Sequence, residues 1–514
     1  MRPYVVECRK MMSRFTFFQF DRATTIDSVV ISGSNSFFSY LSLPRRTAMV
    51  TPPAPSFLEL PVDIHFEILW HMDLCEALPL LHSASELFNS RELWSHVLHA
   101  TRKISPISCP PREDLSLLTC STLRKIAYRV ISLWKNWSLP SPKARYWRRT
   151  VTGHYKLAST DECFLAVIPG THLVVTGSAE REVISCWDTK SGSCVGVMRD
   201  VGKLHSVSYP SYGVPGRMVL AYVSSYDSML TAYATGICVD YADRSLVKFE
   251  QTFRVEIALG QSFSHSYITL AISDRYLVAL AWHTQKLRAG FGIKNLQAAT
   301  ESGLILDAVP EASLPEPSIK THLDGYISRN TLNVIKHTRN TYAVHQYTLS
   351  PDLSASEIFL RAPIVQPPLP QFTSNIHNCS STGRSVSHTS VLPGYHVRYS
   401  FQSPEHERTE FEFEFPRCEM MEAIPAASGR HVLVHYMDGT AGDRVKLLRL
   451  AGNKSCSMHD LHLPLEINLV DRLNEGRGMG SWHGNRRGSI EIDESLGVVY
   501  LLMDDGIIWA VGYS

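Results

Sequence analysis

The residue with the clearest catalytic potential in this 514-residue chain is a cysteine. Cys194 lies between Gly192 and Gly196 in the sequence GSCVG, a cysteine version of the Gly-x-Ser-x-Gly nucleophile motif. That motif needs a strand before the nucleophile, a helix after it and a histidine base close by. Because the residues after Gly196 have the pattern of a strand, we expect the glycines to belong to a hairpin, and we assign no catalytic residue.

Two further groups resemble reactive sites. Asp504 and Asp505 form a carboxylate pair of the kind that performs general acid and base chemistry. Gly506 follows them, so we expect the pair to reverse the chain between two strands. Gly476, Gly478 and Gly480 lack the strand-to-helix context of a phosphate-binding loop, which favours a flexible loop.

An aromatic and basic group follows these glycines. Trp482, His483, Arg486 and Arg487 could bind an acidic or phosphorylated segment, since arginine grips phosphate by paired hydrogen bonds. A solvated loop explains the same residues with fewer assumptions, and it is the interpretation we prefer.

Composition narrows the class of protein. The 11 cysteines show neither a CxxC pair nor the Cys/His spacing of a zinc site, so we expect no metal, no cofactor and reduced thiols in the cytoplasm or nucleus. Lysine and arginine number 50 against 49 acidic residues, which favours no nucleic-acid partner. No apolar run approaches the ~20 residues that span a bilayer, so we expect no membrane partner.

Residues 58 to 94 have the pattern of short, strongly apolar helices. Leu60-Pro61 suits a helix entry, where proline's missing N–H costs nothing. Ile64, Ile68 and Leu69 then form one apolar stripe, widened by Phe66 and Trp70. A second helix is predicted near Asp73, with Leu74, Leu78 and Leu81 at helical spacing, although Pro79 requires it to start later or to kink. A third short element contains Leu87, Phe88, Leu93 and Trp94.

This stretch resembles an F-box, the three-helix module that docks substrate receptors onto a Skp-type adaptor in SCF ubiquitin ligases. The matching features are Leu60-Pro61, Asp63, Ile68-Leu69, Asp73-Leu74 and Leu93-Trp94. The resemblance implies that the adaptor binds Leu60, Pro61, Ile64, Ile68, Leu69, Leu74 and Leu78. It also implies a cullin bound through the adaptor. An amphipathic helical hairpin of an ordinary domain is the alternative.

A longer helix should connect this module to the rest of the chain. From about Glu113 to Trp137, apolar residues recur at i, i+3, i+4 and i+7, with basic residues on the other face. Two prolines in residues 138 to 142 end the pattern. We expect a rigid connector packed between the helical module and the C-terminal part of the chain.

From about residue 147 the hydrophobic period changes from helical to two. Residues 174 to 197 contain three strand patterns separated by turns and resemble a WD-repeat blade, with Trp187-Asp188 as the signature dipeptide. Paired strand patterns recur at 218–222 with 229–233, 276–282, 332–336 with 342–347, 431–436 with 445–450, and 497–502 with 507–513.

The 368 residues from 147 to 514 suffice for about seven blades at roughly 45 to 50 residues each. A closed ring also removes the open sheet edges that so many strands would otherwise expose. A pair of β-sandwiches is the alternative. Residues 362–394, rich in proline and serine, are predicted to be a long loop.

The predicted fold class is therefore multidomain, α followed by all-β. The expected domains are an N-terminal extension (1–50), the F-box (56–98), a helical connector and linker (99–146) and a WD-like propeller (147–514). The extension is interpreted as a disordered tail, with a translation start at Met49 or a mitochondrial presequence as alternatives.

The resemblance implies a substrate receptor that binds an unidentified client protein through the propeller and is not itself an enzyme. The alternatives are a β-propeller enzyme with an accessory helical domain and a scaffold that binds an adaptor without ubiquitylation.

Overall fold

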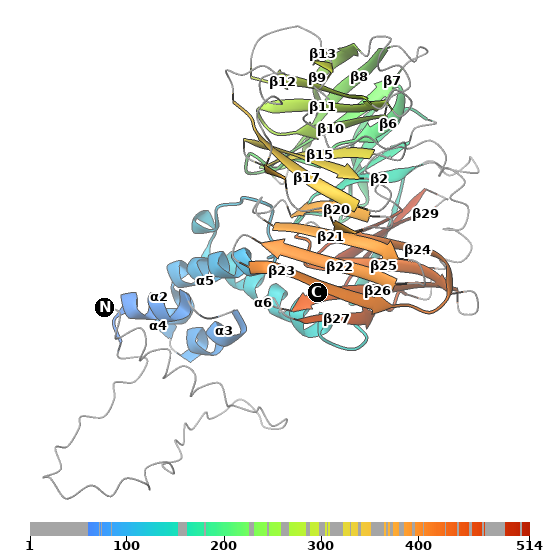
Figure 1. Ribbon diagram of the computed structural model, residues 1–514. Helices are drawn as coiled ribbons and strands as arrows, with labels where there is room; N and C mark the ends of the chain where they lie inside the picture. The colour runs from blue at the N-terminus through green and yellow to red at the C-terminus, as the bar shows by residue number, and fades with distance from the viewer. Residues whose placement is uncertain are drawn as a thin grey trace, which may run out of the picture. The chain divides into compact units, whose positions relative to one another are not determined.

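The computed structural model describes two regular parts, a group of helices and a series of antiparallel sheets (Figure 1). Contacts divide the chain into Met1–Glu59 and Leu60–Ser514, and the predictions for residues 1–50 lie outside the described residues. The described residues are 60–514 except 71, 73, 84, 153–161, 179–180, 226–230, 244–245, 259–266, 284–287, 298–303, 306, 309–321, 329, 338–340, 351–363, 366–368, 371–373, 380–384, 393–395, 404–405, 427, 439–441, 452–454, 465–466, 468–488 and 504–505.

The helices occupy the predicted region, with differences in number and extent. They are α2 (Val62–Trp70), α3 (Leu74–Ser83), α4 (Ser85–Asn89), α5 (Arg91–Ile104), the 3-10 turn η2 (Leu115–Leu117) and α6 (Cys120–Trp137). The third predicted element is two helices, because Ser90 interrupts the chain and its hydroxyl caps α5 by accepting from the Leu93 amide. Helix α3 continues through Pro79. Asp73 lies outside the described residues.

The connector helix starts later than predicted. Asp114 caps the short turn η2, and Thr119 then caps α6 by accepting a hydrogen bond from the Thr122 amide. Two local caps thus divide a stretch whose apolar spacing predicts one helix from Glu113.

Large side chains fill the space between these helices. Leu69, Leu74, Leu81 and Leu93 are buried, and the indole of Trp94 donates to the Phe88 carbonyl at 2.7 Å. Helix α5 contacts α2, α3 and α6, so α6 is joined to the core of the helical group.

The β part consists, among the described residues, of seven sheets that follow one another along the chain. Blade 1 contains β2 (Cys163–Val167), β3 (Leu173–Ser178), β4 (Val183–Asp188) and β5 (Ser193–Met198). Blade 2 contains β6 (Lys203–Val207), β7 (Arg217–Ser225), β8 (Thr231–Asp240) and β9 (Lys248–Ala258), with β13 (Leu304–Ile305) parallel to β9. Blade 3 contains β10 (Tyr267–Ile272), β11 (Tyr276–His283), β12 (Arg288–Asn295) and β14 (Asp307–Ala308).

The remaining sheets repeat this antiparallel order. Blade 4 contains β15 (His322–Ser328), β16 (Thr331–His337) and β17 (Thr341–Thr348), which pairs with β18 (Ile364–Val365) and β19 (Leu369–Pro370). Blade 5 contains β20 (Ser374–Cys379), β21 (Ser385–Leu392), β22 (His396–Ser403) and β23 (His406–Glu414). Blade 6 contains β24 (Cys418–Pro425), β25 (His431–Asp438), β26 (Gly442–Ala451) and β27 (Ser455–Asp460). Blade 7 contains β28 (Ile490–Asp493), β29 (Val498–Met503), β30 (Ile507–Gly512) and, from the other end of the domain, β1 (Tyr146–Val151).

Neighbouring sheets share hydrophobic clusters, as blades of a propeller do. Such clusters join blades 1 and 2, 2 and 3, 3 and 4, 5 and 6, 6 and 7, and 7 and 1. The strand β1 pairs antiparallel with β30, from Tyr146 opposite Gly512 to Val151 opposite Ile507. The first strand therefore completes the last blade, which gives a β-propeller closed by its two ends and excludes a pair of β-sandwiches.

The predicted WD-like blade is confirmed. Strands β3, β4 and β5 cover the three predicted strand patterns, and Gly192 turns the last hairpin at φ 73°. Trp187 is buried, and its indole donates to the Thr176 hydroxyl at 3.2 Å on the neighbouring strand.

The prediction of a long loop over residues 362–394 is wrong. Strands β20 and β21 fall in this stretch and form the first hairpin of blade 5, in register from Ser374 opposite Ser390 to Cys379 opposite Ser385. Serine, asparagine and histidine hide the two-residue period there, because so few apolar residues mark it.

Candidate docking surface of the helical module

The seven residues that the F-box resemblance selects do not share one environment. Pro61 and Ile64 are exposed, Ile64 to 38% of its surface. Leu60, Ile68 and Leu78 are partly exposed. Leu69 and Leu74 are fully buried within the chain, so they support the module from inside.

The geometry of α2 explains this division. His65 and Leu69 are four residues apart and form the buried side of the helix. Ile64 and Ile68, also four apart, form the neighbouring stripe, and Pro61 precedes it by one turn. We call Pro61, Ile64 and Ile68 the α2 stripe. It offers apolar surface that a partner protein could bury.

A cleft of about 390 Å³ lies beside the same helix, and the sequence did not indicate it. It is lined by Phe66, Arg91, Glu92, Ser95, His96, His99 and Ser116. The Phe66 and His96 rings meet edge to face with centroids 5.3 Å apart. At its margin, hydrogen bonds from the hydroxyl and amide of Ser116 lower the pKa of Asp114. The cleft combines aromatic, basic and acidic side chains from α2, α5 and η2.

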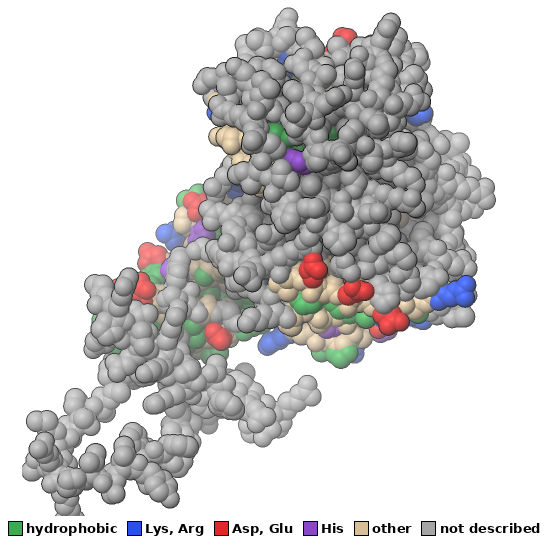
Figure 2. Space-filling view, in the orientation of Figure 1, with side chains coloured by type: hydrophobic (Ala, Val, Ile, Leu, Met, Phe, Trp, Pro, Cys, Tyr) green, Lys and Arg blue, Asp and Glu red, His purple; other side chains and the backbone are tan. Residues whose placement is uncertain are grey.

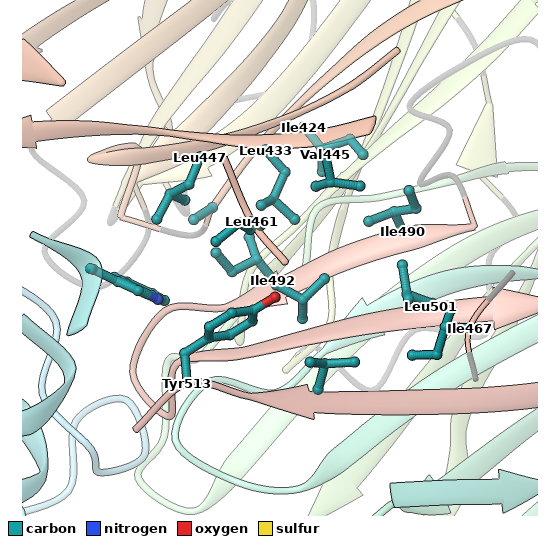
Figure 3. Close-up of a cluster of buried hydrophobic side chains, with 14 of the residues drawn as sticks. Ile424, Leu433, Val445, Leu447, Leu461, Ile467, Ile490, Ile492, Leu501 and Tyr513 are labelled. Carbon is teal, nitrogen blue, oxygen red and sulfur yellow. The ribbon is translucent and has the colours of Figure 1, made fainter. Parts of the chain in front are cut away.

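Helix α6 joins the module to the propeller through apolar contacts. Leu133 and Trp137 belong to the cluster shared by blades 6 and 7. Figure 3 shows side chains of that cluster from both blades, with Leu433 and Leu447 of blade 6 pointing toward Ile492 and Leu501 of blade 7. The end of α6 is therefore part of the propeller core.

Hydrogen bonds fix the same end of α6. The Asn136 amide nitrogen donates to the carbonyls of Tyr513 at 2.6 Å and Lys143 at 2.8 Å, while its oxygen accepts from the Lys143 amide at 3.0 Å. The Arg449 guanidinium donates to the Ser138 hydroxyl at 2.6 Å. The end of α6 is thus bound both to the residue that follows β30 and to blade 6.

A buried acidic turn in blade 7 forms hydrogen bonds with blades 1 and 6 and with the helical linker. Asp493 accepts from the amides of Ser495 at 2.9 Å, Leu496 at 3.1 Å and, in blade 1, Gly170 at 2.9 Å. The Ser108 hydroxyl, from the segment after α5, donates to the Ser495 carbonyl at 2.6 Å.

The next residue of this turn binds blade 6. The Glu494 carboxylate accepts from the Ser428 hydroxyl at 2.6 Å and from His431 Nδ1 at 2.9 Å. Burial lowers the pKa of His431, against the opposing effect of Glu494. Buried carboxyl groups with this many donors fix the geometry of the turn and have no access to a substrate.

The stability of the propeller should depend on pH through Asp493. Burial raises the pKa of its carboxyl to about 7, although three amides donate to it. Its ordinary pKa is about 3.9 in an unfolded chain. Between about pH 4 and pH 7 the folded protein therefore binds more protons than the unfolded one, and the contribution of Asp493 to stability falls as pH rises through this window.

Thermal melts at several pH values test this dependence. Asp493→Asn should lower stability by about 1–3 kcal/mol at pH ~5, because the amide nitrogen, unlike the hydroxyl oxygen of the protonated acid, cannot accept from the backbone amide that it would face. It should also reduce the pH dependence between about pH 5 and 7. Asp188→Asn, at a partly exposed carboxylate, is the control. An unchanged pH profile in Asp493→Asn would contradict the assignment.

Cys194 lacks the surroundings of a nucleophile. It lies in β5, the outer strand of blade 1, where strand β4 precedes the turn and no helix follows. Burial raises the pKa of its thiol. Its sulfur contacts the Cys186 carbonyl at 3.6 Å, and no histidine base adjoins it among the contacts of the described residues.

Cys194→Ala should therefore cost only a packing change of about 1 kcal/mol in the free energy of unfolding. Chemical denaturation measures this cost, and binding of partner proteins should be unaffected. Loss of all function in a stable Cys194→Ala protein would support the enzyme alternative instead.

The other sites considered from the sequence lie outside the described residues: Gly476, Gly478, Gly480, Trp482, His483, Arg486, Arg487, Asp504 and Asp505. Strands β29 and β30, which flank the last pair, do form the predicted hairpin, with Met503 opposite Ile507. Across the described part of the chain, no group of three or more His, Cys, Asp or Glu side chains is placed to hold a metal ion. Its helices are too short or too polar to cross a membrane.

Comparisons with known proteins return similar folds at low identity. The chain is similar to the β-propeller domain of Cps50 (Swd1) from Myceliophteria thermophila, with 12% identity, 71% of this chain and 99% of that chain covered, and a TM-score of 0.38. It is similar to the WD40 domain of SCAP from fission yeast, with 12% identity, 68% and 84% covered, and a TM-score of 0.38. It is also similar to Raptor from Chaetomium thermophilum, with 11% identity, 88% of this chain and 36% of that chain covered, and a TM-score of 0.42. No protein-family model and no curated protein matches the chain.

Proposed function

We propose that this protein is the substrate receptor of an SCF-type ubiquitin ligase. The helical module docks a Skp-type adaptor, and through it a cullin, while the propeller binds a client protein. The observation that carries the proposal is the α2 stripe: Pro61 and Ile64 are exposed at the positions that the F-box resemblance selects. A partner protein that covers the stripe would remove this apolar surface from water.

The connector supports this role because it limits relative movement of the two parts. Helix α6 contacts α3 and α5 at one end and contributes Leu133 and Trp137 to the propeller core at the other. A client on the propeller would then be held at a fixed position relative to the adaptor. In such a ligase, holding client lysines near the charged ubiquitin thioester raises the reaction rate. The receptor itself performs no chemistry, and its action is expected in the cytoplasm, the nucleus or both.

Co-purification with a Skp-type adaptor tests the docking surface. Ile64→Asp combined with Ile68→Asp should abolish adaptor binding, because two charges would be buried against an apolar partner surface. Leu117→Asp is the matched control, since Leu117 is 79% exposed in the same module but lies in η2. Circular dichroism should show both variants folded. Adaptor binding that survives the double substitution, or is absent from the wild-type protein, rejects the proposal.

Client abundance separates the ligase from a scaffold that binds an adaptor without ubiquitylation. In cells expressing Ile64→Asp with Ile68→Asp, proteins that bind the intact propeller should accumulate, because the variant still binds them but does not bring them to the ligase. Mass spectrometry of proteins captured with and without proteasome inhibition measures this. Bound proteins whose abundance is the same in wild-type and variant cells would favour the scaffold.

A further inference from the structure

The outer edge of blade 7 carries a concentration of positive charge. Strand β1 and the residue before it supply Arg145, Arg148 and Arg149, all exposed, and Trp147, 44% exposed. Exposed Arg129 of α6 and Lys190 of the β4–β5 turn add two further cations. We call these six residues the basic edge.

The cations from different elements lie around the same side chains. The charges of Arg129 and Arg148 act on both Tyr146 and His172, and that of Lys190 also acts on His172. Burial is the main cause that lowers the pKa of His172 to about 4, and these cations lower it further. The imidazole therefore adds no positive charge near neutral pH. The Arg148 guanidinium lies 5.2 Å from the centroid of the Tyr146 ring.

Little negative charge offsets this group. None of the five cations forms an ion pair with another described residue. Asp188 is a partly exposed acid whose charge also acts on His172. Its carboxylate accepts from the Lys190 amide at 2.9 Å and the Ser191 hydroxyl at 2.7 Å, which holds its own turn. Five exposed cations without ion-pair partners among the described residues attract anionic segments.

Strand geometry adds backbone groups to the charge. In the sheet order of the described residues, β1 pairs with β30 on one side and has no further strand on the other. Tyr146 packs against the cluster shared with blade 1, which places Arg148 on that face, whereas Trp147 and Arg149 lie on the face of Val511 and Trp509, towards blade 6. Cations therefore border the free edge on both faces.

Charged side chains on an edge strand also prevent unwanted pairing. Two observations go beyond that role. First, Trp147 exposes an aromatic ring in the middle of the basic edge, and an exposed aromatic ring would promote the binding of another chain. Second, Arg129 and Lys190 lie on a helix and in a turn, which need no protection against strand pairing.

We propose that the basic edge binds an extended, Asp- and Glu-rich segment of a partner protein, which adds to β1 as a further strand. Backbone hydrogen bonds to β1 would give affinity. Carboxylates on alternate residues would meet Arg148, Arg129 and Lys190 on one face, and the residues between them would pack against Trp147 on the other face. The proposal does not rest on adaptor binding, since the α2 stripe is a separate surface.

The chain itself contains a segment of the complementary kind. In β23, Glu410, Glu412 and Glu414 are exposed and alternate with Phe411 and Phe413. Figure 2 shows acidic side chains on the surface over the sheets that contain β23 and β26. A second copy of the chain is therefore the alternative occupant that the test must distinguish.

Fluorescence anisotropy with the full-length protein tests the proposal. The probe is a labelled peptide of about 10 residues in which glutamate alternates with valine. It should bind, and binding should weaken as the ionic strength rises from about 0.05 to about 0.3 M. A peptide with lysine in place of glutamate should not bind.

Variants locate the binding. Arg148→Glu with Arg149→Glu should weaken binding about tenfold or more, and the milder Arg129→Gln with Lys190→Gln should weaken it about threefold without changing β1. Trp147→Ala should also weaken it about threefold. The matched control is Lys203→Glu with Lys248→Glu, exposed cations of blade 2. All variants should keep the wild-type melting temperature within a few degrees and the wild-type adaptor binding.

Several results would overturn the proposal. These are undiminished binding in both charge variants, equal loss in the blade 2 control, stronger binding of a single-stranded oligonucleotide than of the acidic peptide, and binding only when phosphoserine replaces glutamate. Self-association in sedimentation velocity that is lost on replacing Glu410, Glu412 and Glu414 by glutamine would reassign the basic edge to a second copy.

Discussion

Deletion of residues 507–514 should convert the protein into aggregates, a larger effect than is expected of any single substitution. Strand β30 pairs with β1 on one side and with β29 on the other, so its loss opens two sheet edges at once. It also removes Ile508, Val511 and Tyr513, which are fully buried between blades.

The truncated protein should elute in the void volume in size-exclusion chromatography and lose its cooperative melt. Removal of Ser514 alone is the control, since Ser514 follows the last paired residue. A soluble truncation from 507 with undiminished β-type circular dichroism and an unaltered melting temperature would show that closure through β1 and β30 is not needed.

A closed ring of blades could be predicted because some of its strand signals are local in the sequence. The apolar runs at 498–503 and 507–512 are separated by a short turn with Gly506, which takes φ 71° as only glycine does readily. The dipeptide Trp187-Asp188 likewise predicts a blade from neighbouring residues alone. Chain length then limits the number of such units to about seven.

The hairpin of β20 and β21 could not be predicted for the opposite reason. Its sequences SNIHNC and SVSHTSVL contain few apolar residues, so their place in a sheet depends on pairing with β22 rather than on their own pattern. Helical spacing likewise did not separate Leu69, which is buried, from Ile68, which is partly exposed, because adjacent residues on a helix differ by about 100° and both fall within a wide apolar stripe.

The buried acids of blade 7 carry no signal in the sequence either. Asp493 and Glu494 occupy a turn that resembles any solvated turn, and only the amide of Gly170 and the His431 ring, distant in sequence, show why they are buried. The close approach of two backbone segments at Gly170 is equally non-local, because a Cβ added there would clash with the backbone of Cys109. The junction between linker and propeller is thus determined by contacts across hundreds of residues.

Trp137→Ala should be the most damaging single substitution at this junction. Trp137 is 1% exposed, belongs to the core shared by blades 6 and 7, and its ring centroid lies 4.7 Å from that of His431. Truncating it should lower the free energy of unfolding by about 3–5 kcal/mol through lost burial and the cavity left behind.

Trp137→Phe provides the matched comparison, because the indole Nε1 of Trp137 has no acceptor in the described part of the chain. Phenylalanine keeps most of the packing and removes this unsatisfied donor, so the cost should be about 1 kcal/mol. Denaturation measures both values, and hydrogen exchange of α6 amides should accelerate only in Trp137→Ala. If the two substitutions destabilised the protein equally, or if α6 exchange stayed slow in Trp137→Ala, the helix would not be anchored through this residue, and the fixed geometry on which the receptor proposal relies would have to come from Asn136 and Arg449 instead.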